Sequence, residues 1–360
     1  MATESGGTKH TTIREVAALA GVSLKTVSRV VNGEPRVAPS TVRRVNDAIA
    51  TLHYLPDATA ARLARGERES RTIALLIASV DDPFSGALFR GVEEVAHTRG
   101  VAVFAASTGG QPEVESRLVR AFASRNVDGL IITPTAQDHH GLADLLAPHM
   151  PCVYLDRDPL GITADVVTSD NRAAGREATE HLLAYGHRRI GLLMDLPSIS
   201  TAVEREAGYR DALASAGIGI DDELVARGVE TDAQGDAATE TLMGLREPPT
   251  ALFTSRNMAS IGAIRALKRL GKLSTIALVG MDDVSLSDLI DPPLSTVRQD
   301  PLAMGRLATA RLFERLDGDD SPPERVLVPT KLVVRGSGEI RPPDADLWNT
   351  VSGDGLETSQ

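Results

Sequence analysis

The segment 11–33 carries two short helical patterns separated by a turn. In the first, the apolar residues follow the i, i+3, i+4, i+7 spacing of one helix face: Ile13, Val16, Ala17 and Ala20. Gly21 suits the left-handed residue that ends a helix, and Ser23 suits the N-cap of the next one. In the second, the inward positions are Val27, Val30 and Val31, and the outward ones are Leu24, Lys25, Thr26, Ser28 and Arg29. This arrangement is typical of a helix-turn-helix DNA reader, with an ordinary small helical bundle as the alternative.

Two further helices are expected before residue 72. One covers 40–52, with its apolar face at Val42, Val45, Ile49 and Leu52. The other is Ala-rich, covers 58–65 and is only about two turns long, so that alone in water it is marginal. Its Leu63 could act as an apolar wedge in the minor groove or could pack against the preceding helices.

From Thr72 onward, apolar strand-like runs alternate with amphipathic helical stretches. The expected strands are 73–79, 101–107, 129–133, 152–156, 190–194, 224–229, 251–254, 276–280 and 326–334. The expected helices are 84–99, 113–124, 141–149, 171–185, 202–216, 233–245, 259–270 and 301–316. This rhythm predicts an α/β fold with two doubly wound parallel-sheet units. Ligands of such folds bind beyond the carboxyl ends of the strands, here in a cleft between the units.

Charge is distributed unevenly along the 360 residues. The net charge is −11, yet residues 1–71 hold eleven basic and seven acidic side chains, which makes them +4 and the remainder −15. The basic residues 1–71 would attract the phosphates of DNA, and the acidic remainder of the chain would discourage unspecific contact with DNA. The single cysteine, Cys152, excludes an intrachain disulfide and fits a reducing cytoplasm. No signal peptide or membrane-length apolar run is evident, and the polar segments 1–10 and 339–360 are expected to be disordered.

Several motifs together resemble the lactose-repressor (LacI/GalR) family of bacterial transcription regulators. In the head they are VAALAGVSLKTVSRVVNGEPRVAPSTVRRV and HYLPDATAARLARG. In the core they are DNRAAGREATEHLLAYGHRRIGLL, REAGYRDAL and LVGMDDVSLSDLIDPPLSTVRQD. The resemblance runs from about Thr11 to Gly338. It implies an all-α helix-turn-helix domain over 11–55, a hinge helix and linker over 56–71, and a core over 72–338 similar to periplasmic sugar-binding proteins.

The resemblance also implies how the core is threaded and how the protein assembles. One subdomain would consist of 72–169 and 300–325, and the other of 170–299 and 326–338. The chain would therefore cross between them near Ser169, Gln299 and Val326. Members of the family bind near-palindromic operators as homodimers, and the tail here lacks the apolar heptads that would favour a tetramer.

The DNA contacts are carried over position by position. The base-facing residues would be Leu24, Lys25 and Arg29, since an arginine can fork onto guanine. The residues placed to bond phosphate would be Thr12, Ser23, Thr26, Ser28, Asn32, Thr41 and Tyr54. For the hydroxyl groups, helix capping is the alternative. Leu63 with Ala60 beside it matches the minor-groove wedge, and Arg62 would lie near the same groove.

The effector site is carried over in the same way. Its residues would be Asp82, Phe84, Ser85, Asp156, Thr201, Arg205, Arg256, Asp282 and Gln299. Carboxylates, a guanidinium fork and an aromatic ring suit a sugar or another polyol. Alternatively, Phe84 is a core residue, and Arg205 and Asp282 form a salt bridge between subdomains. Arg256 stands where many members carry asparagine. It could favour a ligand with a carboxylate or phosphate, or neutralise Asp282.

An enzyme and a transport-type binding protein are the competing interpretations. The chain has no GxSxG, no GxGxxG at a strand–helix turn, no Walker loop and no metal-spaced His/Cys cluster, so no cofactor or metal is expected. The pair His139-His140 fits a solvated loop, and Asp282-Asp283 lacks a partner base. The missing signal peptide and the basic head disfavour a transport protein. The expected function is therefore a cytoplasmic repressor of carbohydrate genes, with double-stranded DNA, a small sugar-like effector and a second copy as partners.

Overall fold

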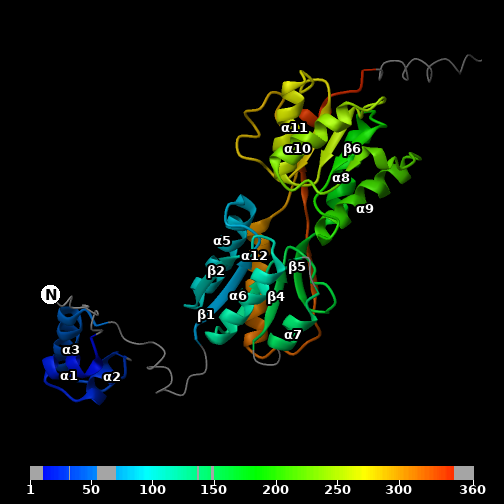
Figure 1. The fold of residues 1–360 in the computed structure, drawn as a ribbon. Coiled ribbons are helices and arrows are strands. Elements are labelled where there is room, and N and C mark those ends of the chain that lie inside the picture. The colour runs from blue at the N-terminus through cyan, green and yellow to red at the C-terminus, as the bar shows by residue number, and fades with distance from the viewer. Residues whose placement is uncertain (1–10, 32, 55–69, 136–137, 147–149, 344–360) are drawn as a thin grey trace, which may run out of the picture. The chain divides into compact units, whose positions relative to one another are not determined.

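The computed structural model describes residues 11–31, 33–54, 70–135, 138–146 and 150–343 (Figure 1). They belong to two compact units, unit 1 within residues 1–70 and unit 2 within residues 71–360. The expected hinge helix over 58–65 and the end segments 1–10 and 344–360 lie outside the described residues. The expectation of disorder from residue 339 is wrong for 339–343, because His181 Nε2 lies 2.7 Å from Glu339 Oε1 and His187 Nε2 lies 2.8 Å from the Ile340 carbonyl oxygen.

Unit 1 contains three described helices: α1 (Ile13–Ala20), α2 (Leu24–Val31) and α3 (Pro39–Leu52). Their small apolar core consists of Val16, Ala17, Ala20, Val27, Val45 and Ala48. The amide of Thr12 donates to the Glu15 carboxylate at 2.7 Å and opens α1 with a capping box. Gly21, with φ of 62°, ends the helix in the left-handed conformation. The predicted helix–turn–helix and the third helix are confirmed.

Unit 2 contains two six-stranded sheets. The first has the order β11-β5-β4-β3-β1-β2, and its strands are β1 (Thr72–Ile77), β2 (Ala102–Ser107), β3 (Gly129–Ile132), β4 (Cys152–Leu155), β5 (Asp165–Ser169) and β11 (Arg325–Val328). The second has the order β12-β10-β9-β8-β6-β7, and its strands are β6 (Ile190–Leu193), β7 (Val225–Ala226), β8 (Ala251–Thr254), β9 (Ala277–Met281), β10 (Ser295–Arg298) and β12 (Lys331–Val333). Neighbouring strands are parallel except for β10 and β12. The predicted α/β class with two parallel sheets is confirmed.

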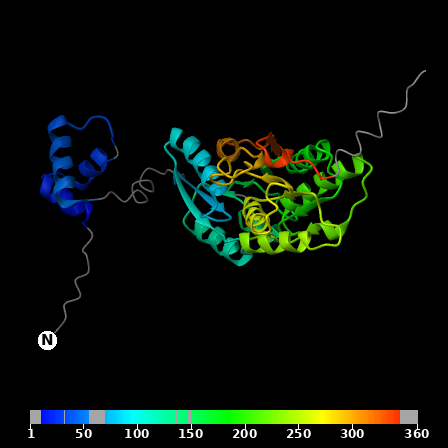
Figure 2. The ribbon, with the colours of Figure 1, turned by 90° about the horizontal axis from the view of Figure 1, so that it is seen from above.

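Helices cover both faces of each sheet. The first lobe, which we define as the first sheet with its helices, has α5 (Pro83–Thr98), α6 (Pro112–Ser124), α7 (His140–Leu146) and α12 (Pro301–Leu316). The second lobe has α8 (Asn171–Ala184), α9 (Ser200–Ser215), α10 (Asp232–Met243) and α11 (Asn257–Arg269). Each lobe has two apolar layers, one on either side of its sheet. The helix-flanked sheets are visible in Figures 1 and 2.

The chain passes between the lobes three times. The crossings follow β5, β10 and β11, and the last is the red segment that leaves the first lobe in Figure 1. The first two follow Ser169 and Arg298. The third lies after Val328, since β11 pairs with β5 in the first sheet. The expected single strand over 326–334 is therefore wrong. It is two strands in different sheets, separated by Pro329, which cannot donate to a ladder.

Close helix pairs recur three times in unit 2. The pairs α5–α12, α8–α9 and α10–α11 each meet at facing glycines: Gly91 with Gly305, Gly175 with Gly208, and Gly235 with Gly262. The tightest approaches are in α8–α9, where a Cβ on Gly175 would lie 2.1 Å from the carbonyl oxygen of Arg205. In each pair a threonine four residues after one glycine donates its hydroxyl to that glycine's carbonyl: Thr179, Thr239 and Thr309. The same packing solution thus positions all three pairs.

Candidate functional site

The N-terminal end of α2 presents polar and basic side chains to solvent. Ser23, Leu24 and Lys25 are all exposed, and 44% of Leu24 remains accessible. Ser23 Oγ accepts from the Thr26 amide at 3.2 Å and lies 2.9 Å from the Thr26 hydroxyl. Ser23 therefore caps the N-terminus of α2, which is the alternative to phosphate contact for this hydroxyl group. Since capping and phosphate contact are compatible, a DNA role for both hydroxyls stays a prediction.

Arg29 lies on α2 beyond this exposed end. Its Nε donates to Glu34 Oε2 at 3.0 Å, and about two-fifths of each side chain is accessible. The terminal nitrogens of Arg29 make no hydrogen bond to the described residues. The arginine is thus accessible, and its far edge is open to a ligand.

The remaining DNA candidates differ in exposure. Thr12 is exposed, and its hydroxyl and amide both bond Glu15. Ser28 and Thr41 are half-buried, and Tyr54 packs against the apolar core of unit 1. Four candidates lie outside the described residues: Asn32, Ala60, Arg62 and Leu63.

In unit 2, two aspartates occupy matching positions at the carboxyl ends of the sheets. Asp156 follows β4 and Asp282 follows β9, and both adopt the left-handed conformation, with φ of 72° and 62°. Their amides still donate to the neighbouring strand, to Val167 at 2.8 Å and to Val297 at 2.9 Å. The left-handed turn therefore ends each strand and points the chain out of the sheet.

The two carboxylates share one electrostatic environment. Burial raises the pKa of Asp156 and raises that of Asp282 to about 6, while the charge of Arg205 lowers both. The negative charge of Asp156 also raises the pKa of Asp282, so a residue of the first lobe acts electrostatically on a residue of the second lobe. Gln299 Nε2 donates to Asp282 Oδ2 at 2.8 Å. The structure thus brings Asp156, Arg205, Asp282 and Gln299 together.

Arg205 is a buried cation on α9, with 7% of its surface accessible. Its Nε donates to Asn171 Oδ1 at 2.8 Å and its Nη1 to the Ser255 carbonyl at 2.7 Å. Burial lowers the pKa of Arg205, and Asp282, Asp156 and Asp195 oppose that effect. The alternative of an Arg205–Asp282 salt bridge between the lobes is wrong, because both residues belong to the second lobe and no ion pair joins them.

Arg256 precedes α11 and pairs with a residue that the sequence did not suggest. Its Nη1 lies 2.8 Å from Asp195 Oδ2, so the alternative that it neutralises Asp282 is wrong. The next residue, Asn257, donates to Asp82 Oδ1 at 3.2 Å and thereby joins the two lobes. Asp82 also accepts from the Phe84 amide as the N-cap of α5.

The other effector candidates are less accessible. Phe84 packs partly buried against the core of the first lobe, as its alternative interpretation stated. Ser85 and Thr201 are buried in the first turns of α5 and α9, with 3% and 6% accessible. Both side chains are therefore poorly accessible to a ligand.

Six buried side-chain polar atoms have no hydrogen-bond partner among the described residues, and three of them belong to residues that adjoin or bond Asp156, Arg205 and Asp282. These three are Arg157 Nε, Ser255 Oγ and Gln299 Oε1. Buried polar groups are normally paired, so atoms of this kind fit a ligand with donors and acceptors. Sequence reasoning missed Arg157, Ser255 and Asn171, although Arg157 and Ser255 directly follow strand positions that it had identified.

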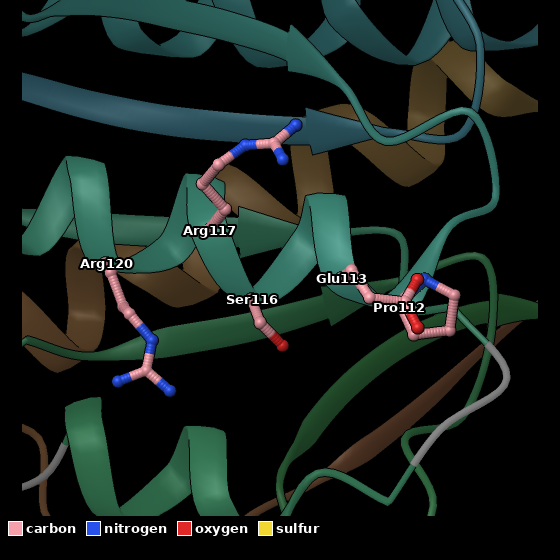
Figure 3. Close-up of a pocket in the computed structure, with 5 residues that line it drawn as sticks. All are labelled: Pro112, Glu113, Ser116, Arg117 and Arg120. Atoms are coloured by element: carbon pink, nitrogen blue, oxygen red, sulfur yellow. The ribbon is translucent and has the colours of Figure 1, made fainter.

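Two other features are excluded as sites. His139 is fully buried, and its Nε2 lies 3.1 Å from Glu115 Oε1, so the predicted solvated loop is wrong for this residue. Its Nδ1 accepts from the Leu160 amide at 3.2 Å, which ties the loop after β4 to α6. On α6, a surface hollow is lined by Pro112, Glu113, Ser116, Arg117 and Arg120 (Figure 3). The two arginines point apart there and share no focus for an anion.

Two protein families match the chain. Residues 12–57 match the family described as bacterial regulatory proteins, lacI family, and residues 179–338 match the periplasmic binding protein-like domain. The chain is 34% identical to the HTH-type transcriptional regulator CelR of Thermobifida fusca over 340 residues, which cover 92% of this chain and 99% of CelR. It is 30% identical to the HTH-type transcriptional regulator KdgR of Bacillus subtilis, covering 92% and 98%.

Solved structures agree with these sequence matches. A CelR–cellobiose complex superposes with a TM-score of 0.69 at 32% identity, covering 91% of this chain and 99% of that one. The Lac repressor dimer bound to operator and the anti-inducer ONPF gives a TM-score of 0.80 at 28% identity, covering 92% and 99%. Among the described residues, no helix is both long and apolar enough to cross a bilayer.

Proposed function

The chain belongs to the lacI family of bacterial regulatory proteins, and from that premise we propose that it is a cytoplasmic repressor of carbohydrate-uptake or catabolic genes. It is a DNA-binding transcriptional regulator and not an enzyme. In the proposal it binds a near-palindromic operator as a homodimer, and a sugar-like effector in the cleft of unit 2 controls that binding.

The exposed N-terminal end of α2 carries the DNA part of the proposal. Leu24 and Lys25 are accessible there, and Arg29 keeps two terminal nitrogens open. A recognition helix meets base edges with this end, and an arginine fork matches the two acceptors of guanine. Thr12, Ser23, Thr26, Ser28, Asn32, Thr41 and Tyr54 would bond phosphates. Leu63, with Ala60 and Arg62, would enter the minor groove at the operator centre.

Replacing Arg29 by alanine is expected to relax base preference at one symmetric pair of operator positions. The expected loss of discrimination is about 1–3 kcal/mol, because a bidentate arginine–guanine contact has that value. Competition binding against a set of single-base operator variants measures it. A uniform weakening across all variants would instead mean that Arg29 touches only phosphate.

For the effector, the charges favour a neutral polyhydroxy ligand. Arg256 is already paired with Asp195, so it does not offer a free cation. Around Arg205, the guanidinium groups of Arg157, Arg205 and Arg256 balance the carboxylates of Asp156, Asp195 and Asp282, and the further charge of Asp82 makes the set acidic. A carboxylate or phosphate ligand would meet repulsion there, while sugar hydroxyls can donate to the aspartates. The cellobiose complex of the relative CelR supports the same ligand class.

Effector affinity is expected to rise with pH up to about 6. Below its pKa of about 6, Asp282 is protonated and is a poorer acceptor for a ligand hydroxyl. Affinity should therefore fall by up to about tenfold per pH unit below 6 and level off above it. Titration calorimetry between pH 5 and 8 measures this, with Asp282→Asn as the control whose profile should be flat. A profile in the unsubstituted protein without an inflection near pH 6 would contradict the assignment.

Exposed apolar side chains support the proposed homodimer. Phe104 lies on β2, an outer strand of the first sheet, with 49% accessible. Leu286 and Leu289 follow β9 in the second lobe, with 67% and 74% accessible. Contiguous exposed apolar patches mark interaction surfaces, whereas single exposed apolar residues are common on any protein. Light scattering of the purified protein distinguishes a dimer from a monomer or a higher oligomer.

A gel-shift assay with promoter DNA, with and without a panel of sugars, tests the whole proposal. Specific retardation that a sugar changes would support it, because an effector shifts DNA affinity only through its different affinity for two states. No preference for any genomic site over random duplex, with or without the sugars, would overturn it.

A further inference from the structure

The turn after α2 brings Glu34 back against Arg29. Gly33 adopts φ of 64°, and the amides of Gly33 and Glu34 donate to the carbonyls of Val30 at 3.1 Å and Arg29 at 2.9 Å. Hydrogen bonds of this kind close a helix at a left-handed glycine. The backbone of Glu34 is therefore fixed to the same residue whose side chain its carboxylate holds.

The contact between the two side chains uses only one of the donor edges of the guanidinium. Glu34 Oε2 accepts from Nε at 3.0 Å, and neither terminal nitrogen bonds a described residue. A guanidinium is planar and rigid, so fixing Nε also sets the direction of the two terminal nitrogens. Those nitrogens can supply the two donors that guanine O6 and N7 accept.

The pair is too exposed to matter much for folding. The accessible fractions are 40% for the Arg29 side chain and 44% for that of Glu34, and exposed ion pairs contribute little to stability. A flexible side chain that is already oriented loses less freedom on binding. A carboxylate on a DNA-facing surface also repels phosphate, whatever the base sequence.

We propose that Glu34 is a specificity-determining positioning residue, which orients Arg29 toward guanine and weakens binding to all other DNA. This inference rests on the proposed DNA-binding function. It predicts that removing the Glu34 carboxylate changes general affinity and base preference in opposite directions. Affinity for random duplex rises, and the preference for guanine at the position read by Arg29 falls.

The test compares Glu34→Gln with Asp47→Asn in the full-length protein. Asp47 is exposed on α3, so both variants remove one negative charge from unit 1, but only one of them touches Arg29. The DNA is a duplex selected from a random library by the unsubstituted protein, together with its single-base variants. Each affinity is measured by fluorescence anisotropy, and circular dichroism checks that both variants fold.

The measured quantity is the affinity for duplexes with guanine at the base pair read by Arg29, divided by the affinity for duplexes with another base there. In Glu34→Gln this ratio is expected to fall about two- to fivefold. Asp47→Asn should raise affinity for random duplex without changing that ratio. In an Arg29→Ala background, Glu34→Gln should leave the ratio unchanged. An unchanged ratio in Glu34→Gln alone, or an equal fall in the Arg29→Ala background, overturns the inference. Absence of any base preference in the unsubstituted protein would instead defeat the proposed function itself.

Discussion

Gly175→Ala is expected to destabilise unit 2 by about 3 kcal/mol, the upper end of the usual cost of overpacking, and to abolish the effector response. The new Cβ would lie 2.1 Å from the carbonyl oxygen of Arg205, where real Cβ contacts below 3.0 Å are essentially never found. The obstacle is backbone, so α9 must move away from α8. That movement displaces Arg205, whose guanidinium depends on Asn171 at the start of α8. Chemical unfolding and effector titration measure the two effects.

The matched control is Gly86→Ala. Gly86 is also helical, in α5, but it is exposed, and a Cβ there would meet nothing within 4 Å. Alanine favours a helix over glycine by about 0.8–1.0 kcal/mol, so this variant should be as stable as the parent or more stable. Equal stability of Gly175→Ala and Gly86→Ala would show that α8 and α9 do not pack as closely as described.

Arg205→Ala is expected to reduce effector affinity at least about 100-fold while DNA binding without effector persists. Truncating one partner of a buried, hydrogen-bonded charge pair costs about 2–5 kcal/mol of binding free energy, because the other partner stays buried without its hydrogen bonds. Here those partners are Asn171 and the Ser255 carbonyl, with the charges of Asp156 and Asp282 nearby. Arg205→Lys keeps the charge but lacks the planar fork, so it should recover only part of the affinity.

Arg172→Ala provides the comparison for Arg205. Arg172 belongs to α8 and bonds Asp211 of α9 at 2.7 Å, but 57% of its side chain is accessible. Such a pair contributes at most about 1 kcal/mol, so effector affinity should hardly change. The measurements are operator binding at increasing effector concentration and thermal unfolding. Similar losses in both variants would place Arg205 outside the effector site and make its role purely structural.

Periodicity was sufficient to predict most of the fold. The helices and most strands of unit 2 were predicted because their apolar spacing is regular. β5 and β10 were missed although they are no shorter than predicted strands such as β3 and β4, since they carry polar side chains such as Thr168, Ser169 and Ser295. Their burial depends on neighbouring strands of the sheet, which a local pattern does not contain. The same limitation merged β11 and β12 into one strand.

The candidate site was predictable only in part. Residues at the ends of strands, such as Asp156 and Asp282, follow from the rule that ligands bind at that edge of a sheet. The ion pair of Arg256 with Asp195 joins residues 61 positions apart, and no spacing pattern indicates it. The Ser255 carbonyl that holds Arg205 is a backbone group, so residue types give no sign of it.

The threading of unit 2 has a consequence for the order in which the protein becomes complete during synthesis. All three described helices of unit 1 lie before residue 55, whereas β11 and β12, one for each sheet, lie between residues 325 and 333. A growing polypeptide therefore contains every described DNA-reading helix long before either sheet can receive its last strand. In a nascent chain, the three helices of unit 1 can therefore fold well before the two sheets of unit 2 are complete.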